Sequence, residues 1–285
     1  MEQAGEQLGA LTRLVAGGGV VVLSGAGIST ESGIPDYRGP NGTMTRHTPM
    51  TYQTFTRDPA ARRRYWARSH LGWRNMAGAA PNAGHRAVAD LERHGLVTGV
   101  ITQNVDGLHQ EAGARAVIEL HGSLYRVICL DCGDSMPRSE LHRRLGEANP
   151  QFDARVTRIN PDGDVDLADE QLDGFYPVSC QTCAGGMLKP DVVFFGETVP
   201  APRVADCFAL VEDARLLLVL GSSLTVMSGR RFVLRAAKLG IPVAIVNRGG
   251  TRGDDYATLT LDAALGTALP ELVERAVAEA NVPTG

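Results

Sequence analysis

Short apolar runs recur along the chain, and stretches with helical spacing of apolar residues separate most of them. The runs predict six strands buried on both faces, as in a parallel sheet, at residues 20–23, 97–101, 117–120, 192–195, 216–220 and 243–246. Helices are expected at residues 7–16, 85–94, 202–213, 230–239 and 270–280. This repeated alternation of strand and helix predicts an α/β fold with a doubly wound parallel sheet.

Two segments interrupt the alternation. Residues 39–83, rich in Arg and aromatic side chains, separate the first strand from its expected helix. Residues 125–189 are polar, show little strand or helix periodicity, and contain four of the five cysteines. Within them, residues 149–174 are rich in Asp, Pro and Gly and predict a surface loop. We interpret both segments as insertions that together form a smaller second domain.

The bulk composition excludes several classes of protein. The 285 residues are 44% hydrophobic and 21% charged, as in an ordinary globular enzyme. A net charge of −4 provides no global field to attract nucleic acid, so no direct nucleic-acid binding is expected. No apolar run reaches the roughly 18 residues of a membrane-spanning helix. The first residues resemble neither a secretory signal nor a transit peptide, so we expect a bacterial-type cytoplasmic protein without membrane partners.

The cysteines form two CxxC pairs, Cys129 with Cys132 and Cys180 with Cys183. Disulfides are rare in the cytoplasm, so the pairs indicate a metal. Four thiolates suit one tetrahedral Zn2+, and a closed four-ligand site is structural. The 47 residues between the pairs (133–179) exceed the usual gap of roughly 15–20, but a longer loop costs little extra entropy. Two unrelated redox or buried pairs remain the alternative. Cys207 stands alone in a helical stretch and is expected to be buried.

A glycine-rich turn follows the first strand. Gly25 and Gly27 fit the phosphate-binding pattern GxGxxG, in which glycines let the backbone approach the anion at a helix start. The third glycine position is occupied by Thr30. By itself, the turn is compatible with a nucleotide site or with a plain tight turn.

The residues after this turn cannot form a regular helix. Gly33 weakens a helix and Pro35 removes a donor, so an irregular loop is expected beside the phosphate site. In such a loop, Asp36 and Arg38 are interpreted as ligand contacts. The whole string GAGISTESGIPDYR resembles the cofactor-binding loop of the sirtuins, which are NAD+-dependent protein deacylases.

A second motif, TQNVDGLH at residues 102–109, follows the strand that ends at residue 101. Ligands of doubly wound sheets bind beyond the carboxyl ends of the strands. The string matches a sirtuin motif residue for residue. The resemblance implies that Gln103, Asn104 and Asp106 line the nicotinamide and ribose pocket, with Asn104 and Asp106 in catalytic, orienting roles.

His121, followed by a glycine, ends the next predicted strand and matches the family's catalytic base. Imidazole suits that role because its ordinary pKa lies near the operating pH. His109 and His85 are poorer candidates, since both are expected in helices.

The resemblance also implies the ligand contacts. KPDVVFFGE at residues 189–197 resembles the strand to which an acyl-lysine peptide adds through main-chain hydrogen bonds. The implied substrate contacts are Val193, Phe195, Gly196 and Glu197. The implied cofactor contacts are Gly25, Ala26, Gly27, Ser29, Thr30, Pro35, Asp36, Tyr37, Arg38, Gln103, Asn104, Asp106, Gly221, Ser222, Ser223, Asn247, Arg248, Gly249 and Leu265.

The resemblance covers roughly residues 7 to 275. It implies a Rossmann-type NAD-binding domain (residues 1–38, 84–124 and 190–285), a helical insertion (39–83) and a structural zinc module (125–189). It further implies NAD+ as cosubstrate, acylated lysine proteins or peptides as substrates, and nicotinamide and O-acyl-ADP-ribose as products. The long gap between the cysteine pairs, residues 64–73 and residues 222–230 resemble class II sirtuins, a subclass associated with lipoamidase activity and ADP-ribosyl transfer.

The preferred acyl chain and the balance between deacylation and protein mono-ADP-ribosyl transfer remain open. Tyr37 replaces the Phe common in deacetylases, and residues 39–49 hold no Tyr–Arg pair of the kind that binds acidic acyl groups. Three rival hypotheses are a nicotinamide-dependent dehydrogenase, a zinc-ribbon nucleic-acid binder and a non-catalytic NAD or ADP-ribose module. The imperfect glycine pattern, the net charge and His121, respectively, argue against them.

Overall fold

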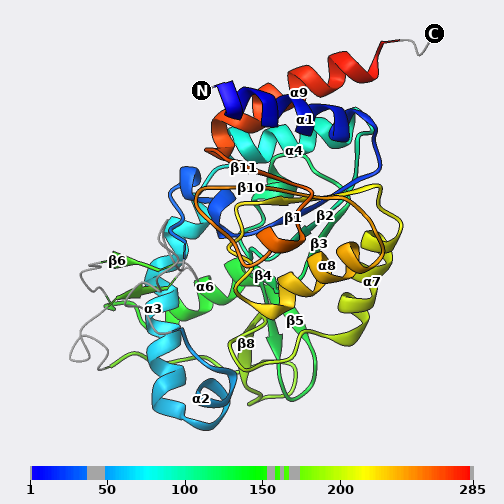
Figure 1. The fold of residues 1–285 in the computed structure, drawn as a ribbon. Coiled ribbons are helices and arrows are strands. Elements are labelled where there is room, and N and C mark those ends of the chain that lie inside the picture. Colours follow the sequence, from blue (N-terminus) through cyan, green and yellow to red (C-terminus); the bar gives the residue numbers. More distant parts are fainter. Residues whose placement is uncertain (1, 37–48, 153–157, 161–163, 167–173, 283–285) are drawn as a thin grey trace.

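The computed structural model describes residues 2–36, 49–152, 158–160, 164–166 and 174–282. Its larger part is a six-stranded parallel sheet with the order β11–β10–β9–β1–β2–β3 (Figure 1). The strands are β1 (Val20–Ser24), β2 (Val97–Thr102), β3 (Val117–Glu119), β9 (Leu216–Leu220), β10 (Val243–Asn247) and β11 (Leu259–Asp262). The predicted α/β doubly wound fold is confirmed.

Helices cover both faces of this sheet, which explains why its central strands β1, β9 and β10 are apolar on both faces. Val20 and Val22 point into a core shared with α1 (Glu2–Ala16), α4 (Ala83–Arg93) and α9 (Leu265–Ala280). Val21 and Leu23 point into a second core with α7 (Ala201–Glu212) and α8 (Met227–Lys238). Alternate side chains of one strand therefore serve opposite faces. Cys207 is fully buried in the second core, as expected.

One helix and one strand differ from the prediction. Helix α9 begins at Leu265 rather than at Pro270, and the Glu31 carboxylate accepts a hydrogen bond from the Gly266 N–H, one of the free donors of its first turn. Strand β11 was not predicted. Its four residues lie at the sheet edge, and alternate side chains are exposed, so it has no continuous apolar run.

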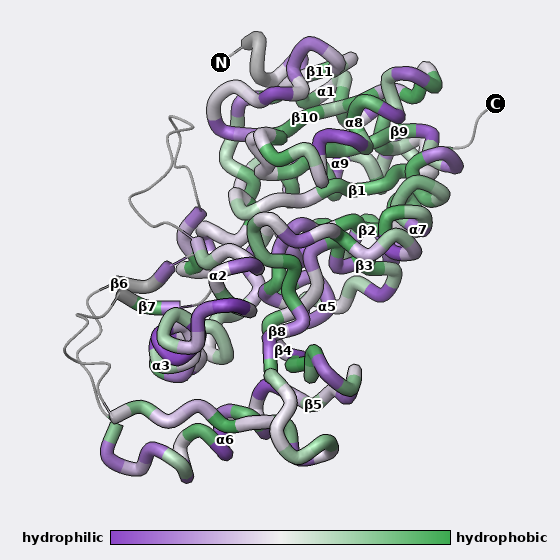
Figure 2. The backbone as a smooth tube through the Cα atoms, turned by 90° about the horizontal axis from the view of Figure 1, so that it is seen from below, coloured by the Kyte–Doolittle hydropathy of each residue, from purple (hydrophilic) through white to green (hydrophobic). Residues whose placement is uncertain are grey.

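The smaller part is built around an antiparallel sheet with the order β5–β4–β8. Its strands are β4 (Gly122–Cys129), β5 (Ser135–Pro137) and β8 (Leu188–Val192). Helices α2 (Tyr52–Arg57), α3 (Pro59–Ala77) and α6 (Arg138–Ala148) complete it, with a short hairpin of β6 (Arg158–Ile159) and β7 (Val165–Asp166). One hydrophobic core, including Phe55, Trp66, Val127, Leu141 and Leu188, joins these segments. Figure 2 shows α3 as mixed hydrophilic and hydrophobic, in contrast to the hydrophobic strand β1.

Two predictions for this region were wrong. The strand expected at residues 192–195 lies at Leu188–Val192, in the small antiparallel sheet, and only a single bridge joins Phe195 to Thr51. Residues 125–189 contain a regular helix and three-stranded pairing instead of irregular structure. Helical periodicity was hidden because α6 buries Arg138 and Arg144 beside Leu141. The predicted loop at 149–174 lies partly outside the described residues, and its described part includes β6 and β7.

No helix in the described ranges has the length and apolar character needed to cross a bilayer.

Candidate active site and metal centre

The turns after β1 and β9 meet backbone to backbone at the carboxyl ends of the strands. The Gly25 N–H donates to the Leu220 carbonyl at 3.0 Å, and the Gly27 N–H donates to the Gly221 carbonyl at 2.8 Å. A Cβ at Gly27 would lie 2.8 Å from the Gly221 Cα, and Gly221 itself has a φ of +60°. Only glycine permits this approach, which leaves an open crevice where the strand order reverses.

A cavity of about 990 Å³ occupies this crevice and extends toward the smaller part of the structure, where Met50 and Tyr65 line it. Ligand sites are typically about 300–1,000 Å³, so the cavity has room for a dinucleotide together with a second ligand. The predicted residues that line it are Gly25, Ala26, Gly27, Ser29, Thr30, Pro35, Asp36, Gln103, Asn104, Asp106, His121, Val193, Phe195, Gly196, Glu197, Gly221, Ser222, Ser223, Asn247, Arg248 and Leu265. Gly249 is not among the lining residues, and Tyr37 and Arg38 lie outside the described residues.

A carboxylate and an amide are held at the floor of the cavity. Asp106 is 5% exposed; it accepts hydrogen bonds from the Ser29 hydroxyl at 2.6 Å and from the Leu108 N–H at 3.1 Å. Asn104 donates from Nδ2 to Ser29 Oγ at 2.9 Å and to the Gly25 carbonyl at 3.2 Å. Burial raises the pKa of Asp106, whereas these donors oppose the shift. The network fixes the direction of both side chains.

His121 presents one ring nitrogen without a proton beside the cavity. Its Nδ1 lies 2.9 Å from the Gln103 carbonyl, which can only accept, so Nδ1 carries the proton of the neutral ring. Nε2 then has a free lone pair and accepts from the Ser228 hydroxyl at 2.8 Å. Burial lowers the pKa of His121, and the charges of Arg203 and Arg231 add to this shift. The ring is therefore neutral near pH 7, with its basic nitrogen beside the cavity.

A second layer of buried polar groups lies behind this floor. His109 Nε2 is 2.9 Å from Ser24 Oγ, and His85 Nε2 is 3.4 Å from Ser29 Oγ. The rings of His85 and His109 meet edge to face at 5.0 Å. Desolvation lowers the pKa of His85 to about 4 and that of His109 to about 3, so both rings are neutral. The sequence shows both residues, but no local signal reveals that they meet.

The predicted peptide edge is attached to the turn between β3 and β4 that carries His121. The Val193 N–H donates to the His121 carbonyl at 2.8 Å, and the Phe195 carbonyl accepts from the Tyr52 N–H at 2.9 Å. The Glu197 carboxylate bends back and accepts from the Phe194 N–H at 2.8 Å. Sequence reasoning did not anticipate the contribution of α2 to this edge.

The four predicted metal ligands come together. Their Sγ atoms all lie within 4.8 Å of one another, with 3.7 Å between Cys129 and Cys183 and 3.8 Å between Cys132 and Cys180. Zn–S bonds of about 2.3 Å produce a tetrahedron with edges of about 3.8 Å, so the set fits Zn2+. A Cβ at Gly186 would lie 2.4 Å from Cys129 Sγ, so glycine is required beside the thiolates. This role of Gly186 was missed.

A doubly wound sheet whose glycine turns, buried carboxylate, amide and imidazole share one cavity defines a nucleotide-binding enzyme. Residues 25–228 match the family described as "Sir2 family". A Streptomyces coelicolor protein named "NAD-dependent protein deacetylase 1" is 66% identical over 258 residues, covering 90% of this chain and 86% of that protein. The Bos taurus "NAD-dependent protein lipoamidase sirtuin-4, mitochondrial" is 46% identical over 254 residues, covering 88% and 80%.

Solved structures agree. One described as "Sir2-p53 peptide-NAD+" has a TM-score of 0.72 and 32% identity, covering 90% of this chain and 92% of that one. The chain therefore belongs to the Sir2 family. The prediction of a sirtuin-type, NAD+-dependent deacylase with NAD+ as cosubstrate is confirmed, as is the four-cysteine cluster. Assignment to class II stays a prediction.

Proposed function

We propose that this chain removes acyl groups from protein lysine side chains and transfers them to the ADP-ribose part of NAD+, with release of nicotinamide. The observation that carries the proposal is the position of the basic Nε2 of His121. It lies beside the cavity that Asn104 and Asp106 also line, and the backbone carbonyl of His121 accepts a hydrogen bond from Val193 of the peptide edge. Base, nucleotide pocket and peptide edge are thus one site.

Each side chain has a distinct task. NAD+ supplies an electrophilic ribose carbon and nicotinamide as the leaving group. Asn104 and Asp106 orient the polar groups around that ribose, because Ser29 holds both in place. His121 accepts a proton at Nε2 from a ribose hydroxyl and is held in the correct tautomer by the Gln103 carbonyl. Orientation by the protein supplies much of the rate enhancement.

We further propose that uncharged acyl chains are preferred, in keeping with the class II assignment. One end of the cavity is lined by buried apolar side chains, namely Ile34, Tyr65, Met76, Leu124 and Phe194. The cationic side chains among the described lining residues are Arg231 and Arg248, which come from α8 and the turn after β10. An acyl carboxylate at the apolar end would lose its hydration without a cation from the described lining residues, which is costly.

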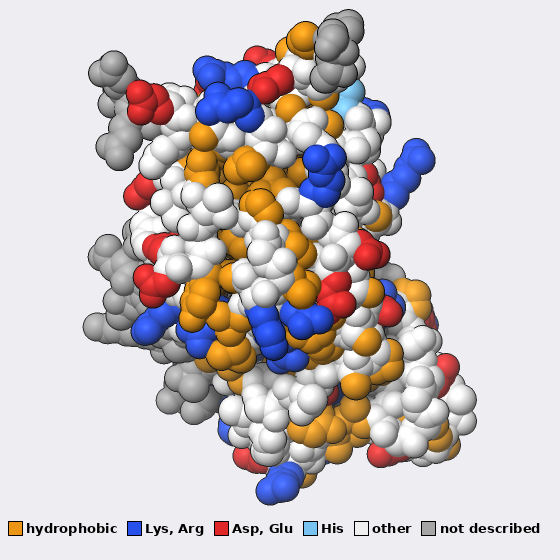
Figure 3. Space-filling model, turned by 45° about the vertical axis from the view of Figure 1, so that its right-hand side comes forward, with side chains coloured by type: hydrophobic (Ala, Val, Ile, Leu, Met, Phe, Trp, Pro, Cys, Tyr) orange, Lys and Arg blue, Asp and Glu red, His pale blue; other side chains and the backbone are white. Residues whose placement is uncertain are grey.

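We also propose a cytoplasmic location, which the clustering of four cysteines as ligands suited to one Zn2+ supports, because cysteine pairs in the cytoplasm rarely form disulfides. On the face shown in Figure 3, hydrophobic side chains form a broken band, and Lys and Arg lie in several separate groups. Such a distribution supports a peptide substrate more than a nucleic-acid ligand.

The products test the proposal. Incubation with NAD+ and peptides that carry acetyl-, lipoyl-, decanoyl- or glutaryl-lysine should yield deacylated peptide and O-acyl-ADP-ribose in equal amounts, as mass spectrometry can measure. The lipoyl and decanoyl peptides should have a higher kcat/KM than the glutaryl peptide. ADP-ribose attached to the peptide or enzyme, with the acyl group intact, would instead identify an ADP-ribosyltransferase.

A further inference from the structure

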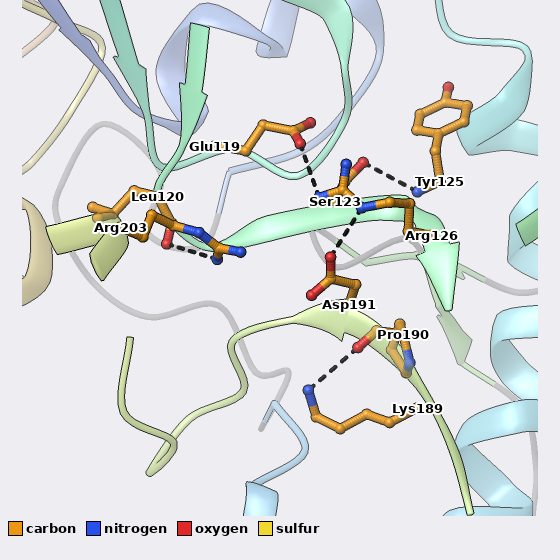
Figure 4. Close-up of polar contacts among 9 residues, drawn as sticks. All are labelled: Glu119, Leu120, Ser123, Tyr125, Arg126, Lys189, Pro190, Asp191 and Arg203. Atoms are coloured by element: carbon orange, nitrogen blue, oxygen red, sulfur yellow. Dashed lines mark hydrogen bonds and ion pairs between the residues drawn. The ribbon is translucent and has the colours of Figure 1, made fainter. Parts of the chain in front are cut away.

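Lys189 is a fully buried lysine beside the peptide edge. Its side chain is 1% exposed. The ammonium donates to the Pro190 carbonyl at 3.2 Å, to the Val192 carbonyl at 2.5 Å and to the Glu197 carboxylate at 3.0 Å. Figure 4 shows the first of these bonds. An ammonium has three N–H donors, so the three bonds satisfy it completely.

The three acceptors belong to one segment of chain, residues 190–197, which we call the substrate loop. Its backbone turns around the ammonium. The centroids of the Phe194 and Tyr52 rings lie 4.5 Å and 5.9 Å from Lys189 Nζ. Glu197 also accepts from the Phe194 N–H at 2.8 Å, so its carboxylate ties both ends of the turn. The ion pair of Lys189 and Glu197 therefore connects both ends of the loop from within.

The loop is also bonded to neighbouring segments of the chain. The Val193 N–H donates to the His121 carbonyl at 2.8 Å, and the Gly196 carbonyl accepts from Gln53 Nε2 at 3.0 Å. The acceptors of Lys189 flank these attachments, since Pro190 and Val192 precede Val193 and Glu197 follows Gly196. A change in the pair would move the peptide edge relative to His121 and would leave the glycine turns of the nucleotide pocket in place.

From this geometry we propose that Lys189 and Glu197 are positioning residues that set the backbone of the substrate loop for the acyl-lysine peptide. The inference rests on the proposed function. It assigns Glu197 a different role from a direct peptide contact, since the carboxylate faces Lys189 and the Phe194 N–H. Peptide recognition then depends on the loop's main chain, and peptides with acidic, neutral or basic flanks should depend on the pair equally.

The test compares three variants. Lys189→Met keeps the length of the side chain and removes the ammonium, and Glu197→Gln keeps the shape and removes the negative charge. Arg126→Met is the matched control, because Arg126 also pairs with a carboxylate of the substrate loop, Asp191, and with Glu119 of β3, but is half exposed (Figure 4). Surface pairs of this kind contribute little. The measurements are KM for acyl-lysine peptides, affinity for ADP-ribose, and amide hydrogen exchange of residues 190–197.

We expect Lys189→Met and Glu197→Gln to raise the peptide KM at least tenfold, irrespective of peptide charge, and to speed exchange in the substrate loop. Affinity for ADP-ribose should change less than twofold, and Arg126→Met should match the unmodified protein. Equal losses of peptide and ADP-ribose binding, or an effect confined to basic peptides, would overturn the inference. Hydrogen exchange reports on the loop even if the unmodified protein deacylates none of the peptides, so failure of the proposed function is recognised separately. If Lys189→Met does not fold, Glu197→Gln alone decides.

Discussion

Replacement of Gly27 by Ala tests the backbone contact at the centre of the nucleotide site. The added Cβ would lie 2.8 Å from both the Cα and the carbonyl oxygen of Gly221. An ordinary van der Waals contact begins near 3.4 Å, so the two turns would have to separate by about 0.6 Å. Neither contact atom is the end of a flexible side chain. Separation would stretch the hydrogen bond from the Gly27 N–H to the Gly221 carbonyl, now 2.8 Å.

Overpacking of this kind costs about 1–3 kcal/mol. If the cost falls on the binding-competent arrangement of the turns, ADP-ribose affinity falls roughly 5- to 150-fold, since about 1.4 kcal/mol is tenfold. Calorimetric titration with ADP-ribose and urea unfolding would measure the two effects. Gly5→Ala is the matched control: Gly5 lies in α1 and a Cβ there meets nothing within 4 Å, so stability should rise by about 0.5–1 kcal/mol.

A Gly27→Ala protein that binds ADP-ribose with unchanged affinity, and unfolds within about 0.5 kcal/mol of the unmodified protein, would refute this reasoning. It would show that the turns after β1 and β9 adjust without cost.

Three further predictions concern the metal and the histidines. Cys132→Ser should lose zinc and melt at a lower temperature, whereas Cys207→Ser, the control, should retain the metal. Full zinc content in Cys132→Ser, measured by elemental analysis, would contradict a four-thiolate site. His85 and His109 have depressed pKa values in the folded state, so the unfolded chain binds more protons than the folded chain below about pH 6.5. The free energy of unfolding should therefore decrease as the pH falls toward 4, by about 1.4 kcal/mol per pH unit for each ring. In urea unfolding, the free energy of unfolding of His109→Asn should depend less steeply on pH between pH 7.5 and 5 than that of the unmodified protein. An unchanged slope would contradict the prediction. Burial also lowers the pKa of His121, so kcat/KM should begin to fall only at a pH below the ordinary histidine pKa. A fall in kcat/KM that begins above pH 6.5 would argue against a buried base.

The large sheet was predictable because its signals are local. Both faces of β1, β9 and β10 are buried, so each is a nearly continuous apolar run that the sequence displays directly. The glycine turns were equally visible, since backbone contact between Gly27 and Gly221 demands residues without side chains. Edge strand β11 has no such run, because only one of its faces is buried.

The smaller part, built around β4, β5 and β8, was harder to predict because its stability depends on contacts between distant segments. Helix α6 buries Arg138 against the rings of Trp66 and Trp73, so a charge occupies a core position and conceals the apolar stripe. The zinc ligands themselves were recognisable from the CxxC spacing, but the need for glycine at position 186 follows only from the approach to Cys129.

At the site, residue types were predicted better than their partners. Motifs indicated His121, Asn104 and Asp106, but no pattern in the sequence reveals that Ser228 bonds His121 Nε2 or that Lys189 bonds Glu197. Ser228 lies in α8, far from His121 along the chain, and Lys189 meets Glu197 only because the segment between them turns back.

Nicotinamide release is the most direct test of the central claim that His121 is the base of an NAD+-dependent deacylase. Release should be measured with NAD+ and an acetyl- or lipoyl-lysine peptide, for the unmodified protein and for His121→Ala. The account predicts release that requires the acylated peptide, accompanied by deacylated product, and loss of that product in the variant with ADP-ribose affinity retained. Deacylated peptide formed at an equal rate by His121→Ala, or no release by the unmodified protein with any acylated peptide, would contradict it.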